Sequence, residues 1–135
     1  MEEKLVKVFI VAGVVIEKDG KFLLVQEKQP KCYGQWNLPA GRVEEGLSIE
    51  ETAIKEAKEE TGFDVELLEK LGIFQDSTET PVKHSFTAKI VSGEPRFSKD
   101  ELLDVRWFTL EEIEAMKDKL RGENWVLGSI KKSKK

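Results

Sequence analysis

Three glutamates in the middle of the chain, Glu56, Glu59 and Glu60, are spaced so that they would share one face of a helix. Neither Glu56 nor Glu60 has a lysine or arginine at a neighbouring helical position, and like charges at this spacing repel. Both also border the apolar side of such a helix. Clustered carboxylates at the edge of a core attract a cation, and oxygen ligands favour Mg²⁺ or Mn²⁺ over zinc. The alternative is a solvated glutamate-rich face.

The remaining composition excludes several other kinds of site. His84 is the only histidine, so a histidine-rich zinc site is excluded, and any Ser-His-Asp arrangement would have to use it. It lies in the alternating stretch Lys83–Ile90, which predicts a place in a strand. Cys32 is the only cysteine, so no intrachain disulfide can form.

Charge and hydropathy limit the partners. The net charge is −4 and acidic and basic residues are interspersed, so no basic stripe marks a nucleic-acid platform. The apolar run Val8–Ile16 is too short to span a bilayer. We therefore expect a cytoplasmic protein without nucleic-acid or membrane partners, as a monomer or homodimer. The basic residues Lys131, Lys132, Lys134 and Lys135 predict a solvated, frayed terminus.

One helix must position the three glutamates. Ser48 is a good N-cap, and Glu51 three residues later completes a capping box. Gly62 is well placed as the C-terminal cap. An apolar stripe is expected to face the core; it comprises Ile49, Ala53, Ile54 and Ala57.

Strands precede and follow this helix. Asp19-Gly20 predicts a hairpin between Val6–Ile16 and Lys21–Gln26, and a short strand is expected at Gln35–Leu38. Loops are expected at Glu27–Gly34 and Ala40–Gly46, further strands at Val65–Phe74, Val82–Val91 and Val105–Phe108, and a second helix at Leu110–Leu120, capped by Thr109 and Glu112. This order predicts a mixed sheet flanked by helices, in a single domain over residues 1–130 with a basic tail at 131–135.

Residues Gly41–Phe63 resemble the Nudix box of the MutT-like Nudix hydrolases. Seven positions match it in register: Gly41, Glu56, Ala57, Glu59, Glu60, Gly62 and Phe63. The flanking segments LPAGRVEEG and VRWFTLEEI are also similar to the family. Two positions depart, because Leu47 replaces a glutamate and Lys55 replaces an arginine. In the family this pair is associated with bracing the loop against the helix, so the bidentate brace is expected to be lost here. The resemblance implies the Nudix fold, an α/β/α sandwich with a mixed β-sheet.

The resemblance also implies a site. Glu56, Glu59, Glu60 and the main-chain carbonyl of Gly41 would bind Mg²⁺ or Mn²⁺, and Glu56 or Glu59 would act as the catalytic base. Arg42 and Gln26 are candidate substrate-binding residues. Additional ligands could come from Glu44, Glu45 and Glu101, whereas Trp36, Trp107 and Trp125 are expected mainly in the core.

The implied activity is hydrolysis of a pyrophosphate bond in a nucleoside diphosphate linked to a further group. The expected substrate is a (deoxy)nucleoside triphosphate or an oxidised nucleotide. Pro81 and the segment Leu38–Gly41 favour an ADP-ribose-type nucleotide sugar as the alternative. A second alternative, motivated by Leu47 and Lys55, is a regulatory module that binds nucleotides without cleaving them.

Overall fold

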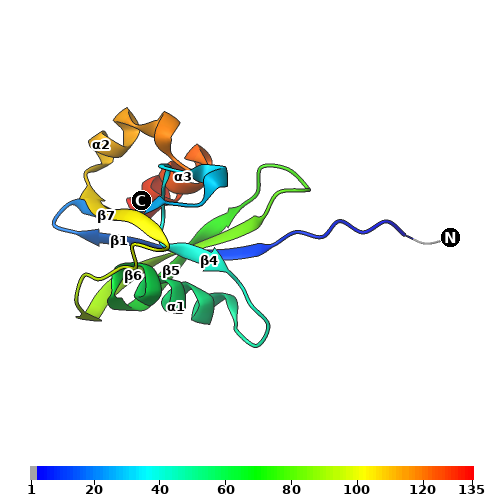
Figure 1. Cartoon of the computed structure of the whole chain (residues 1–135), viewed down its shortest axis with the longest axis horizontal. Coiled ribbons are helices and arrows are strands. Elements are labelled where there is room, and N and C mark those ends of the chain that lie inside the picture. The colour runs from blue at the N-terminus through cyan, green and yellow to red at the C-terminus, as the bar shows by residue number, and fades with distance from the viewer. Residues whose placement is uncertain (1–2) are drawn as a thin grey trace.

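The computed structural model describes residues 3–135, in which a mixed β-sheet lies between helices (Figure 1). The strand order is β3-β2-β1-β6-β5, with β4 paired to β1 and β7 paired to β2. Strands β1 and β6 run parallel, and the other pairs are antiparallel. The strands are β1 (Ile10–Lys18), β2 (Lys21–Glu27), β3 (Trp36–Asn37), β4 (Ala40–Arg42), β5 (Phe63–Phe74), β6 (Val82–Gly93) and β7 (Leu102–Phe108). The helices are α1 (Ile49–Thr61), α2 (Leu110–Ala115) and α3 (Glu123–Ser133), with 3₁₀ turns at Pro30–Cys32 and Lys117–Lys119.

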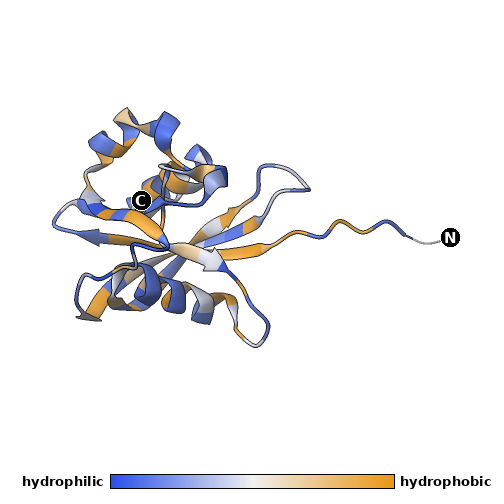
Figure 2. Cartoon of the chain, viewed as in Figure 1, coloured by the Kyte–Doolittle hydropathy of each residue, from blue (hydrophilic) through white to orange (hydrophobic). Residues whose placement is uncertain are grey.

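The central strand β1 separates two hydrophobic cores. Its residues 12–16 are all buried, because helices cover both faces of the sheet. One core contains Val15, Trp125 and Ile130 and lies under α2 and α3, and the other contains Val14 and Ala57 and lies under α1. Figure 2 shows the matching pattern, with hydrophobic colour along the central strands and a largely hydrophilic α1. The expected α/β architecture with a mixed sheet is confirmed.

The predicted hairpin is confirmed, with small shifts in the strand ends. Asp19 and Gly20 both have positive φ, +52° and +77°, as a two-residue turn between twisted strands requires. The first strand begins at Ile10 rather than at Val6. The expected loop at Ala40–Gly46 begins instead with strand β4, because its residues pair with β1.

Helix α1 has both of its predicted caps. The Ser48 side chain accepts from the Glu51 amide, the Glu51 carboxylate accepts from the Ser48 amide, and Gly62 is left-handed at φ +84°. Ala53 and Ala57 are buried, and these small residues let the helix pack close to β1. The prediction for Ile54 was wrong, since it is 39% exposed. The buried face of α1 is centred on Ala53 and Ala57, and Ile54 lies outside this face.

The C-terminal part differs most from the prediction. The second helix has its predicted capping box, but α2 ends at Ala115. Helix α3, which was not predicted, buries Trp125, Val126 and Ile130. The four tail lysines are exposed as expected, but the tail is not frayed throughout, because α3 continues to Ser133. Beyond it, the Nζ of Lys134 lies 3.0 Å from a carboxylate oxygen of Glu17. Across residues 3–135, none of the helices has the length and apolar character needed to cross a membrane.

Candidate functional site

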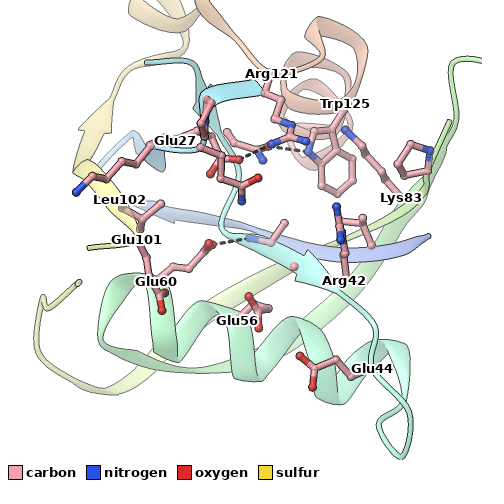
Figure 3. Close-up of a pocket in the computed structure, with 18 of the residues that line it drawn as sticks. Glu27, Arg42, Glu44, Glu56, Glu60, Lys83, Glu101, Leu102, Arg121 and Trp125 are labelled. Atoms are coloured by element: carbon pink, nitrogen blue, oxygen red, sulfur yellow. Dashed lines mark hydrogen bonds and ion pairs between the residues drawn. The ribbon is translucent and has the colours of Figure 1, made fainter. Parts of the chain in front are cut away.

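A cavity of about 760 Å³ opens above α1, between strand β4 and the start of α3 (Figure 3). Its lower wall is acidic, with Glu56 and Glu60 projecting from α1. Its opposite wall carries basic and aromatic side chains. Further residues that line the cavity are Val11, Glu27, Lys28, Gln29, Pro30, Asn37, Ala40, Gly41, Arg42, Glu44, Pro81, Lys83, Asp100, Glu101, Leu102, Arg121 and Trp125.

Glu56 is held against the main chain of β4. A Cβ atom added to Gly41 would overlap the Glu56 carboxylate, so only glycine allows this approach. The Glu56 side chain is 17% exposed. Burial raises its pKa to about 7, and the neighbouring Glu59 carboxylate contributes in the same direction. Glu56 is therefore a partly desolvated carboxyl group that changes its charge near neutral pH.

Glu60 lies one helical turn further along the same wall. Its carboxylate accepts a hydrogen bond of 2.9 Å from the amide of Ala40, which fixes the side chain against the first residue of β4. Burial nevertheless raises its pKa well above the usual range, and the carboxylates of Glu27, Glu56 and Glu101 add to this effect. The cavity thus concentrates acidic groups that a cation would stabilise in their ionised forms.

Glu59 is placed differently from the other two glutamates. Its side chain is 48% exposed, and it does not line the cavity. The Nζ of Lys55 lies 3.3 Å from the Glu59 carboxylate and 3.9 Å from those of Glu56 and Glu44. Sequence reasoning missed the contact with Glu56, because it considered only positions three and four residues away. Lys55 therefore links α1 to the loop before it through an ion pair with Glu44. Its ammonium group is a point charge and does not replace the bidentate contact of an arginine.

The donor set fits a hard divalent cation. Glu56, Glu60 and Gly41 line the same cavity, and their side-chain and main-chain oxygen atoms are the kind of ligand that such a cation prefers. Among residues 3–135, no three acidic, histidine or cysteine side chains lie close enough together to hold a metal ion as they stand. Two contacts account for this, since Glu60 accepts from Ala40 and Glu59 is drawn outward by Lys55.

The opposite wall is built from residues far apart in the sequence. The Arg121 Nη1 donates to the Glu27 carboxylate at 2.8 Å, and Glu27 is only 7% exposed. The same nitrogen lies 2.7 Å from the Cys32 Sγ, and burial raises the pKa of that thiol. Asn37 accepts a hydrogen bond of 2.8 Å from the indole nitrogen of Trp125. Sequence reasoning missed this wall because no local pattern joins residues about 90 positions apart.

The other predicted site residues have mixed placements. Arg42 lines the cavity, with its guanidinium 3.8 Å from the centre of the Phe9 ring. Gln26 does not line it, since its side chain donates to the Gly34 carbonyl. Glu44 and Glu101 line the cavity, whereas Glu45 is exposed outside it.

The aromatic and histidine predictions concern the core. Trp36 and Trp125 are buried as expected, Trp107 is half-buried against the core under α1, and Trp125 also forms part of the cavity wall. His84 lies in a strand, β6, as predicted, and its side chain is buried.

Known proteins share this fold and the segment that forms the site. A family model described as the NUDIX domain matches residues 7–127. A NUDIX hydrolase from Nitrosomonas europaea superposes with a TM-score of 0.84 at 30% identity, covering 95% of this chain and 89% of that chain. The chain is 33% identical over 94 residues to a putative 8-oxo-dGTP diphosphatase from Bacillus subtilis, covering 70% of this chain and 61% of the relative.

An ADP-ribose pyrophosphatase from Methanocaldococcus jannaschii is 32% identical over 103 residues, covering 73% of this chain and 60% of the relative. The chain spans only 33% and 31% of the lengths of two further curated relatives.

Proposed function

Because this chain belongs to the Nudix family, we propose that it hydrolyses a pyrophosphate bond in a nucleoside diphosphate linked to a further group, with Mg²⁺ or Mn²⁺ as cofactor. The observation that carries the proposal is the placement of Glu56 against Gly41 and of Glu60 against Ala40 in the wall of one cavity. The cavity combines carboxylates whose pKa values are raised by burial with basic side chains. This combination is characteristic of sites for charged substrates.

The proposed metal ligands are Glu56, Glu59, Glu60 and the carbonyl of Gly41. When bound, a divalent cation neutralises phosphate charge and lowers the pKa of a nearby water. The hydrogen bond from the Ala40 amide orients the Glu60 carboxylate and limits its rotation. The close contact with Gly41 likewise restricts the Glu56 side chain. Both restraints reduce the conformational entropy that ligand binding would otherwise cost.

Glu56 is the proposed base that accepts a proton from the attacking water, with Glu59 as the alternative. Its carboxylate is half-buried in the cavity wall against the main chain of β4, where the attacking water would also have to lie. Arg42 lines the same cavity and makes no ion pair among residues 3–135, so its guanidinium is available for a phosphate oxygen. We omit Gln26 from the proposed site, since its amide is engaged with Gly34.

The proposed substrate is a (deoxy)nucleoside triphosphate or an oxidised nucleotide. The similarity to the Bacillus subtilis protein supports this class. An ADP-ribose-type nucleotide sugar is the second candidate, supported by the archaeal relative and by Pro81 in the cavity wall.

The test is product analysis on purified protein with nucleoside triphosphates, 8-oxo-dGTP, ADP-ribose and a phosphomonoester, each with Mg²⁺, with Mn²⁺ and with EDTA. We expect release of a nucleoside monophosphate only when a divalent cation is present, and no turnover of the phosphomonoester. Nucleotide binding without cleavage under every condition would favour the non-catalytic module instead.

A further inference from the structure

The cavity has an unneutralised cation at the end away from Glu56 and Glu60. Lys83 projects from β6 into the cavity beside Trp125, on the opposite wall from α1 (Figure 3). Its Nζ lies 5.5 Å from the centre of the Trp125 ring. Among residues 3–135, no carboxylate lies within 4.0 Å of this nitrogen, and it donates no hydrogen bond to a protein atom.

The neighbours of Lys83 do not compensate its charge. Burial lowers the pKa of this lysine, and the nearby Arg121 guanidinium lowers it further. Glu27 and Asp76 act in the opposite direction, but Glu27 is already bonded to Arg121. A partly buried ammonium group loses hydration, and the contact with the Trp125 ring replaces only part of it, since no hydrogen-bond acceptor is supplied by residues 3–135.

The two walls therefore favour groups of opposite kinds. The α1 wall requires a cation, which under the proposed function arrives with the diphosphate. On the opposite wall the acceptor atoms of Glu27 and Asn37 are already bonded to Arg121 and Trp125, whereas the Lys83 ammonium group is a donor without an acceptor among residues 3–135. A substrate that spans the cavity would place an oxygen acceptor against Lys83.

We propose that Lys83 is a specificity-determining residue that binds an oxygen-acceptor group of the substrate, at the end of the cavity opposite Glu56 and Glu60. This inference rests on the proposed function for the identity of the substrate as a nucleotide. The acceptor could belong to a carbonyl-bearing base such as guanine or to a phosphate remote from the scissile bond. Both present oxygen atoms to the same ammonium group.

The test compares Lys83→Met with Lys83→Arg and Lys132→Met. Methionine is an unbranched side chain one atom shorter than lysine and removes the charge, whereas arginine retains the charge. Lys132 is a matched control, because its Nζ lies 5.1 Å from the ring of Phe74 but it does not line the cavity. Binding is measured by NMR titration in EDTA, with guanosine as the base-only probe and inorganic pyrophosphate as the phosphate-only probe.

We expect Lys83→Met to weaken the binding of one probe by about ten- to hundredfold, the range for losing a hydrogen bond to a charged group. Lys83→Arg and Lys132→Met should bind it nearly as the wild type does. Loss of guanosine affinity identifies a base carbonyl as the acceptor, and loss of pyrophosphate affinity identifies a phosphate.

Unchanged affinity of Lys83→Met for both probes would overturn the inference, as would failure of the wild type to bind either probe. These titrations contain no divalent cation and require no turnover. A failure of the proposed hydrolysis would therefore leave their outcome intact and can be recognised separately.

Discussion

Replacing Glu56 by glutamine should change how the stability of the cation-free protein depends on pH. The raised pKa means that the folded state binds the Glu56 proton more tightly than the unfolded state does. Folding therefore loses stability as the pH rises from the unfolded value of 4.5 to the folded value of about 7. The loss is absent below pH 4.5 and complete above pH 7. Glutamine resembles the protonated carboxyl group and cannot ionise, so the variant should not suffer this loss.

The size of the effect follows from the shift. One pKa unit corresponds to about 1.4 kcal/mol, so the change from 4.5 to about 7 amounts to about 3 kcal/mol. The 17% exposure of the side chain lets water screen part of this, which gives about 2–3 kcal/mol. At about 4 °C per kcal/mol for a domain of this size, Glu56→Gln should melt about 8–12 °C above the wild type at pH 8.

The assay is thermal and urea unfolding in EDTA between pH 4.5 and 8. Glu50→Gln serves as the control, since Glu50 is an exposed residue of the same helix. The advantage of Glu56→Gln should shrink towards zero at pH 4.5 and should also shrink when saturating Mg²⁺ is added to the wild type. A variant that is no more stable than the wild type at pH 8, or equally stabilised at both pH values, would refute the reasoning.

Three other substitutions have defined outcomes. Gly41→Ala should lower kcat/KM at least tenfold, because the alanine Cβ would displace the Glu56 carboxylate. Circular dichroism should show an intact fold, and turnover equal to that of the wild type would contradict this prediction. Arg121→Met should destabilise the protein by about 1–3 kcal/mol in urea unfolding, because it leaves the buried Glu27 carboxylate without the guanidinium that donates to it. Adding Glu27→Gln should restore part of the lost stability, and strictly additive effects of the two substitutions would contradict the importance of this ion pair. Ile130→Ala should cost about 2–4 kcal/mol, whereas a solvated C-terminal segment would give no change.

Features encoded by neighbouring residues could be predicted from the sequence. The caps of α1 depend on Ser48, Glu51 and Gly62, all within or beside one helix, and the hairpin depends on two adjacent residues. The match to the family motif placed three carboxylates on one helix for the same reason, and two of them, Glu56 and Glu60, line the cavity. Their electrostatic state was not predictable, since the desolvation of Glu60 depends on where β4 lies against α1.

Features that depend on tertiary contacts were missed. Helix α3 contains Gly128 and closely spaced polar residues, so its local propensity is weak, and packing of Trp125 and Ile130 against the sheet stabilises it. The cavity wall opposite α1 is formed by residues that no periodic pattern links, among them Lys83, Arg121 and Glu27. Ile54 was misplaced because the helical count does not show which side of the alanine stripe meets the sheet.

The central claim is that Glu60 and its neighbours on α1 bind the divalent cation used for pyrophosphate hydrolysis. The most direct measurement is kcat with the best nucleotide substrate at saturating Mg²⁺, for wild type, Glu60→Gln and the exposed control Glu50→Gln. The account predicts that Glu60→Gln loses at least two orders of magnitude in kcat while its fold is unchanged by circular dichroism, and that Glu50→Gln keeps wild-type activity. Equal kcat values for Glu60→Gln and wild type would contradict the assignment of the site.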